Sequence, residues 1–348
     1  GVKAISLPGL TPDELGKRVT DIMRKTNFAS LLEWTWKTIC CPCLDALSIT
    51  GPGSDDKELP HVWWMPVGLV NQLPLHAAGV YGLKSRETVM DRVISSYALT
   101  FKALLHGRRQ RSMAMAKDKS EVGAAVLVAM TETPDLEGGG ALPYAEEEAQ
   151  MLRNICPSLG IEAVSPSPKK EHVLSRLPGC SIFHFAGHGR TNGKEPSLSC
   201  ILLEDWKHDP LAVGDLRDAR LHEDPPFMAY LSACSTGADR WWRLPDEGIN
   251  LVGAAHLAGF RHVVGTFWQV SDRHCVDVAK VLYETLRDEG LTDDAVALGL
   301  HRGVRALRDG KMHGGGDRDA TLIRKGITVQ PPQGISNPFW IPYFHFGV

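Results

Sequence analysis

The chain has 348 residues, which is enough to bury one large core or two modest ones. Hydrophobic residues make up 43% of it, charged residues 23%, and the formal net charge is -3, so it lacks the basic balance of nucleic-acid-binding proteins. Its apolar runs, such as 124–130, are far shorter than the roughly 20 residues of a membrane helix. We therefore expect a globular protein with neither nucleic acid nor membrane as a partner.

The eight cysteines are spread unevenly along the chain. A secreted disulfide framework is usually shorter and denser in cysteine, so we expect reduced thiols and a cytoplasmic location. The CCPC cluster at 40–43 has no second ligand pair nearby, which favours buried cysteines in an apolar helix over the alternative of a metal site. We expect neither a metal nor an organic cofactor. The chain has no starting Met and no signal-peptide layout, so we expect a piece of a longer protein.

Apolar residues at three- and four-residue spacing predict helices over 13–48, and a Gly/Pro/Ser/Asp-rich loop at 51–60 ends this part. We expect an N-terminal helical segment at 1–60, packed on or part of a main domain at 61–348. Beyond the loop, apolar strands alternate with helices, which predicts an α/β fold with a mostly parallel central sheet flanked by helices. The predicted strands are 61–67, 122–130, 181–186, 226–232, 262–269 and 338–348. The predicted helices are 146–155, 170–177, 250–258, 274–288 and 295–307.

Two of these strands end abruptly in small residues around one reactive side chain. The first is followed by Gly-His-Gly at 187–189, and the second by Cys234 and a Ser-Thr-Gly turn. Parallel sheets carry catalytic groups at the carboxyl ends of their strands, so His188 and Cys234 face each other if the strands are neighbours. An imidazole beside a thiol takes its proton and returns it to a leaving amine, which predicts Cys234 as nucleophile and His188 as general base. The glycines leave room for a substrate backbone, and the amides of Gly189 and Cys234 are candidates for an oxyanion hole.

Other reactive residue types in the chain favour simpler interpretations. A cysteine in an apolar setting is usually a small buried hydrophobe, and four fit this description: Cys156, Cys180, Cys200 and Cys275. His184 lies four residues before His188 on the same face of the strand, and we interpret it as a structural residue beneath the site. No acid lies at an obvious triad spacing, so a backbone carbonyl is expected to orient the catalytic ring.

The motifs HFAGHG (184–189), LSACSTG (231–237) and DEGINLVGAAHLAGFRHVVGTFWQVSD (246–272) together resemble a CHAT domain, a caspase-like domain often found behind tetratricopeptide repeats. Further similarity lies in WWMPVGLVNQLPLHAAG, ALPYAEEEAQML and the closing NPFWIPYFHFGV, so the resemblance covers roughly residues 60–348. It implies a caspase-like three-layer sandwich, shared with caspases, separase, gingipains and metacaspases. It also implies His188 as base, Cys234 as nucleophile and Gly189 as oxyanion donor.

The resemblance also suggests where substrate binds. Glu247 matches the Glu-Gly after the nucleophile loop, and Trp268 and Asp272 match a Trp and an Asp where caspases shape their substrate pockets. Asp272, Asp246 or Glu247 would then offer a carboxylate to a basic P1 side chain, and Trp268 would line an apolar subsite. Helix capping is the simpler role for these acids. The loop 238–245, with Trp241 and Trp242, is bulkier than the Gly-rich loop we would expect, which leaves the substrate class open.

The function that the resemblance implies is a cysteine endopeptidase that cleaves a specific protein partner through a thioester intermediate. It would be regulated within a larger signalling, cell-death or defence protein, with an upstream sensor or repeat domain. One alternative is a catalytically silent CHAT scaffold for protein–protein interaction, against which the intact His and Cys argue. Another is a different thiol hydrolase, such as an amidotransferase, which would have a small closed pocket.

Overall fold

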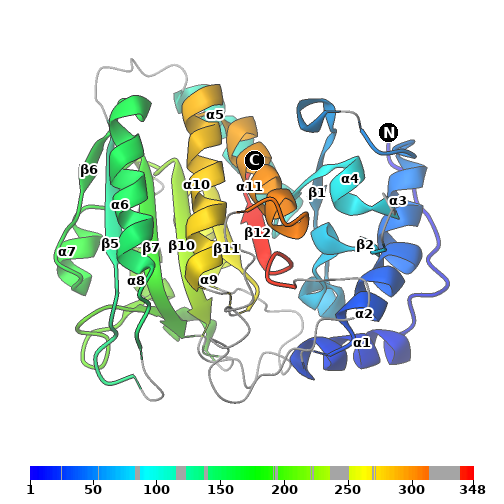
Figure 1. The fold of residues 1–348 in the computed structure, drawn as a ribbon, viewed down its shortest axis with the longest axis horizontal. Coiled ribbons are helices and arrows are strands. Elements are labelled where there is room, and N and C mark those ends of the chain that lie inside the picture. Colours follow the sequence, from blue (N-terminus) through cyan, green and yellow to red (C-terminus); the bar gives the residue numbers. More distant parts are fainter. Residues whose placement is uncertain are drawn as a thin grey trace.

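The computed structural model describes residues 1–24, 26–53, 55–82, 87–114, 123–136, 140–190, 192, 195–219, 221, 223–235, 251–268, 270, 272–312 and 338–348. Among these residues, ten strands form one mostly parallel sheet with helices on both faces, which confirms the predicted α/β class (Figure 1). Eight strands follow one another across the sheet in the order β1 (His61–Trp64), β4 (Ile94–Tyr97), β12 (Tyr343–Phe346), β11 (His262–Thr266), β10 (Met228–Ser235), β7 (Ile182–Arg190), β5 (Ala124–Ala129) and β6 (Glu162–Val164). Two more, β8 (Cys200–Leu202) and β9 (Leu211–Ala212), continue the sheet beside the end of β7.

The end of the chain joins the two halves of this sheet. Strand β12 lies between β4 and β11 and pairs antiparallel with β11, with Val264 opposite His345. On its other side it pairs with β4, where Phe346 is opposite Tyr97. The indole nitrogen of Trp63 in β1 donates to the carbonyl of Gly347 at 3.0 Å. Among the described strands, β12 therefore joins β1 and β4 to the central strands.

Three helices cover one face of the sheet, α6 (Ala145–Ile155), α10 (Asp272–Glu289) and α11 (Asp293–Arg308); Figure 1 shows α6 and α10 in front of the strands. Helix α9 (Leu251–Ala258) covers the opposite face, because a Cβ on Gly265 of β11 would lie 2.3 Å from Val252. The remaining helices are α1 (Pro12–Arg24), α2 (Phe28–Thr35), α3 (Cys41–Ala46), α4 (Val89–Arg92), α5 (Phe101–Ala114), α7 (Lys170–Leu174) and α8 (Val213–Asp218). The helices on both faces make this a three-layer sandwich.

The N-terminal helices share the main core. A π-helical turn, Trp36–Cys40, joins α2 to α3, so the predicted helical stretch 13–48 is helical over most of its length. Leu31 and Leu32 of α2 are fully buried in the same hydrophobic cluster as the central strands. Of the CCPC cysteines, Cys40 is buried as predicted, whereas Cys41 and Cys43 are half-buried. The described residues contain no group of three or more ligand side chains placed to hold a metal.

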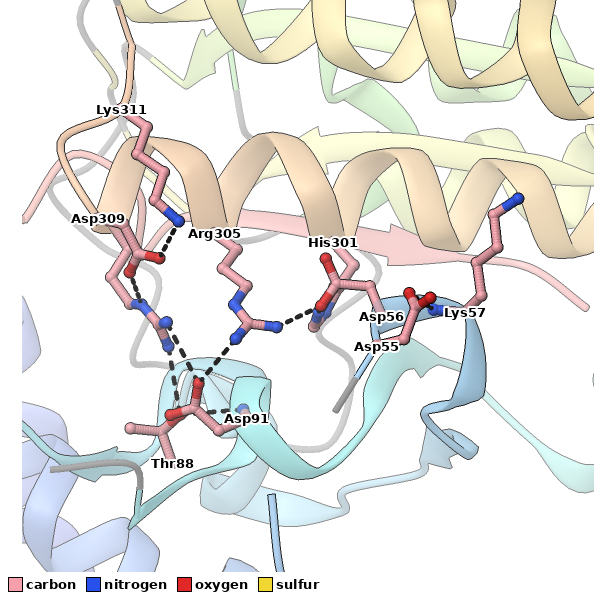
Figure 2. A network of polar contacts seen from close by, with 10 residues as sticks. Asp55, Asp56, Lys57, Thr88, Asp91, His301, Arg305, Asp309 and Lys311 are labelled. Carbon is pink, nitrogen blue, oxygen red and sulfur yellow. Dashed lines mark hydrogen bonds and ion pairs between the residues drawn. The ribbon is translucent and has the colours of Figure 1, made fainter. Parts of the chain in front are cut away.

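An ion-pair network ties α11 to the early part of the chain (Figure 2). The buried carboxylate of Asp91 lies 3.5 Å from the guanidinium of Arg305 and 3.3 Å from that of Arg308. Arg305 also contacts Asp56, whose Oδ1 is 3.7 Å from Nε2 of His301. The His301 imidazole and, less strongly, the neighbouring arginines outweigh burial and lower the pKa of Asp56 to about 2. The network fixes α11 on the side of the molecule where β1 and α4 lie.

Several predicted boundaries were wrong. Strand β7 continues through Gly187 to Arg190, and β10 continues to Ser235, because β8 and β7 respectively supply a neighbouring strand at these positions. The predicted strands at 61–67, 262–269 and 338–348 are shorter than expected, and β4 was not predicted. No helix in the described parts of the chain combines the length and apolarity needed to cross a membrane.

Candidate active site

The two strands that carry His188 and Cys234 are direct neighbours. They run parallel, and their register pairs Cys234 with His188, next to the pair Ser235 and Gly189. Neighbouring strands lie about 4.8 Å apart, so the backbones at these two positions are as close as a sheet allows. The His188 side chain is 5% exposed. Both residues belong to the last two or three positions of their strands, at the edge where α/β proteins place catalytic groups.

Strand β8 encloses the end of β7 on its other side. It pairs antiparallel with β7, with Leu202 opposite His188 and Ile201 opposite Gly189. The backbone of Gly189 therefore lies inside the sheet, between Ile201 and Ser235, and not in an open turn as predicted. Leu202 is fully buried, so the described surroundings of His188 on the β8 side are apolar.

The glycine before His188 has a packing reason that the sequence did not reveal. A Cβ on Gly187 would lie 2.4 Å from Cζ of Phe185, whose ring is fully buried. Successive residues of a strand point to opposite faces, so this contact is on the face away from His188. The space beside Gly187 is filled by the Phe185 ring and is not left for substrate.

We expect Gly187→Ala to destabilise the fold by about 1–3 kcal/mol, because the added methyl group must displace the buried Phe185 ring. Urea unfolding followed by circular dichroism measures this loss. Gly16→Ala is the matched control, since a Cβ at Gly16 meets nothing within 4 Å and alanine favours a helix. Equal stability of Gly187→Ala and the parent would contradict the tight packing at this position.

A buried polar cluster lies two to four residues before the positions of Cys234 and His188 on these strands. The hydroxyl of Ser232 donates to Oε2 of Glu148 at 3.0 Å, and Oε1 of Glu148 lies 3.3 Å from Nε2 of His184. Nδ1 of His184 is 2.8 Å from the hydroxyl of Tyr283, and its ring stacks on Tyr230 with centroids 5.0 Å apart. Burial raises the pKa of both tyrosines well above the ordinary value, so they are neutral. These contacts fit the structural role expected for His184 beneath the site.

Glu148 is the member of this cluster that the sequence interpretation missed. It is the third of three consecutive glutamates at the start of α6, where acids suit a helix N-terminus and are usually exposed. Its spacing relative to the apolar residues of α6 is the signal that could have revealed it. The buried positions of α6 are Ala145, Glu148, Ala149 and Leu152, a helical stripe in which Glu148 occupies an apolar position.

The predicted pocket residues are only partly described. Asp272 is the first residue of α10, is half-buried, and its Oδ2 accepts the backbone N–H of Tyr144 at 2.8 Å. Burial, aided by the charges of Glu148 and Glu147, raises the pKa of Asp272. Trp268 stacks on Phe28 of α2 with centroids 5.6 Å apart. Several predicted positions lie outside the described residues: Asp246, Glu247 and the loop 238–245 with Trp241 and Trp242.

Comparison with solved structures defines the class of fold. Two structures of gingipain R, an Arg-specific cysteine proteinase, one of them from Porphyromonas gingivalis, match 96% of this chain and 74% and 75% of their own. Their TM-scores are 0.51, at 13% and 11% identity. A Saccharomyces cerevisiae separase–securin complex matches with a TM-score of 0.50 at 12% identity, covering 83% of this chain. The chain spans 15% of that matched chain. It therefore has the fold of the caspase-like cysteine peptidases, as predicted.

A family model makes the assignment more specific. The CHAT domain model matches residues 30–314, which is most of the chain. The protein belongs to the CHAT domain family, as its motifs indicated. The match begins inside α2, so it includes part of the N-terminal helical segment. No curated protein sequence matches the chain.

Proposed function

We propose that the protein is a cysteine endopeptidase with Cys234 as nucleophile and His188 as general base. The observation that carries the proposal is the register of β7 and β10, which pairs these two residues at the carboxyl ends of neighbouring parallel strands. Membership of the CHAT family and the caspase-like fold support the same chemistry. A silent scaffold would need neither a thiol nor an imidazole at this edge.

The chemistry follows from the two side chains. A free thiol has a pKa of about 8.5, so a few per cent of it is thiolate at neutral pH. The His188 imidazole takes the Cys234 proton, and the thiolate attacks the peptide carbonyl carbon to give a tetrahedral oxyanion. His188 then protonates the leaving amine, which leaves a thioester that water hydrolyses. The candidate for donating to the oxyanion is the amide of Cys234, because the backbone of Gly189 is enclosed between β8 and β10.

We further propose that a basic P1 side chain is preferred. Asp272 begins α10, which follows the carboxyl end of β11 and so starts at the same edge of the sheet as the dyad. Its half-buried carboxylate contributes negative charge to this edge. An Arg or Lys side chain would complement that charge. Trp268, held against Phe28, would form an apolar wall beside it.

The proposed setting is a larger cytoplasmic protein whose sensor or repeat domain controls the peptidase and presents a protein substrate. Separase was solved in complex with securin, so that protein binds a protein partner. This supports the proposal because the fold is shared and the matched chain is much longer than this one.

The peptidase proposal is tested with acyloxymethyl ketone peptides that carry Arg, Lys, Leu or Met at P1. We expect covalent labelling of the parent, faster with Arg or Lys than with Leu or Met, and a loss of that preference in Asp272→Asn. Labelling is followed by intact mass spectrometry, with Asp309→Asn, at the C-terminal end of α11, as the control acid. No labelling or hydrolysis with any peptide would favour the scaffold alternative, and a preference for Leu or Met would contradict the role of Asp272.

A further inference from the structure

A carboxylate is buried in the interface between helices α6 and α10 and the centre of the sheet. Glu148 is 1% exposed. A carboxylate removed from water is costly unless its oxygens are paired, and apolar side chains would fill such an interface at no such cost. The polar groups around Glu148 must therefore compensate the cost of burying its carboxylate.

The two oxygens of Glu148 contact different strands. Oε2 accepts the Ser232 hydroxyl of β10 at 3.0 Å, and Oε1 lies 3.3 Å from Nε2 of His184 on β7. These are the two strands that end in Cys234 and His188. The carboxylate of Glu148 thus bridges the pair of strands that carries the proposed dyad.

The register places this bridge directly below the dyad. Ser232 precedes Cys234 by two residues, and His184 precedes His188 by four. Residues two or four apart share a face of a strand, and each residue adds about 3.3 Å, so Glu148 lies roughly 10 Å below the dyad. Positions 184, 188, 232 and 234 all lie on the face covered by α6 and α10.

His184 lies between Glu148 and Tyr283 in this cluster. Its Nδ1 is 2.8 Å from the Tyr283 hydroxyl, and its Nε2 lies 3.3 Å from Oε1 of Glu148 without the alignment of a hydrogen bond. The other ionisable groups that face Glu148 are Tyr230, Tyr283, Tyr343 and Asp272. Burial raises the pKa of all three tyrosines, which are therefore uncharged, and burial also raises the pKa of Asp272.

From this arrangement we infer that Glu148 is a positioning residue of the proposed dyad. It fixes the relative position of β7 and β10 through His184 and Ser232, and its charge stabilises the protonated form of His188. The inference rests on the proposed peptidase function and supplies the acid that the sequence did not reveal. Glu148 acts from beneath the strands and makes no contact with substrate.

The test is a titration of His188 that does not need activity. The Cε1 proton of His188 is followed by NMR in the Cys234→Ala background and assigned by its loss in Cys234→Ala/His188→Gln. A unit charge roughly 10 Å away in a medium of effective dielectric about 20 shifts a pKa by about one unit. Adding Glu148→Gln is therefore expected to lower the pKa of His188 by about one unit, and Ser232→Ala by less. In the active parent, Glu148→Gln is expected to lower kcat up to about tenfold with KM unchanged.

Asp293→Asn is the matched control. Asp293 is also a buried carboxylate beside a buried imidazole, with Oδ1 2.9 Å from Nε2 of His262, but it lies at the opposite end of the strands. We expect it to leave the pKa of His188 unchanged. No shift in Glu148→Gln and Ser232→Ala, or the same shift in Asp293→Asn, would overturn the inference. Unaltered peptide hydrolysis by Cys234→Ala would instead overturn the proposed function, so the two failures are distinguishable.

Discussion

Replacing Cys234 with alanine is expected to reduce peptide hydrolysis at least about 1000-fold, because no thioester can form without the thiol. His188→Gln is expected to cause a loss of the same order, since the thiol then lacks the group that removes its proton and later protonates the leaving amine. The measurement is kcat/KM on a fluorogenic peptide chosen by the P1 screen, with each variant shown to be folded by its unfolding transition.

The double variant tests whether Cys234 and His188 act as one unit. Residues that act as one unit are strongly non-additive, so Cys234→Ala/His188→Gln is expected to be no slower than Cys234→Ala alone. Cys180→Ala is the control for loss of a thiol, because Cys180 is buried just before β7, at the far end from the dyad. It is expected to retain activity. Additive losses, or full activity in Cys234→Ala, would contradict a dyad at these positions.

The second large effect is expected for stability, in Asp91→Ala. Its carboxylate is 5% exposed and is shared by Arg305 and Arg308 of α11 (Figure 2). Removing one member of a buried ion pair leaves the other charges uncompensated, and we expect a loss of about 3 kcal/mol in the free energy of unfolding. Urea or thermal unfolding measures this loss.

A neighbouring acid provides the control. Asp309 also pairs with Arg308, at 2.8 Å, but its side chain is 25% exposed, and such pairs contribute at most about 1 kcal/mol. Asp309→Ala should therefore cost much less than Asp91→Ala. Similar losses in the two variants would show that the Figure 2 network does not hold α11 through Asp91.

The sequence predicted the class of fold because its strands are apolar and alternate with amphipathic helices. It did not predict β4, since two of its four residues are serines. The structure explains them: Ser96 lies 2.6 Å from both His61 and His345, and Ser95 accepts the indole N–H of Trp64. These partners are up to 249 residues away in sequence, so no local pattern marks the strand.

Contacts between residues far apart in sequence also limited the prediction of the site. His188 and Cys234 were identified from glycines and small residues next to them, and the structure meets the condition that their strands are neighbours. The predicted end of β7 was wrong because β8 pairs with its last residues. This pairing depends on tertiary contacts, which no local sequence pattern reveals. Glu148 was missed because three adjacent glutamates suggested an exposed helix start, whereas only the third lies on the buried stripe of α6.

The central claim is that Cys234 is the reactive nucleophile. A peptidyl acyloxymethyl ketone reacted with the parent, followed by proteolysis and mass spectrometry, shows which thiol carries the adduct. The half-buried Cys41 and Cys43 are internal competitors, and burial raises the pKa of both, which makes them weak nucleophiles. We predict an adduct on Cys234 that disappears in His188→Gln. An adduct on any other cysteine, or one on Cys234 that is unaffected by His188→Gln, would contradict the proposed dyad.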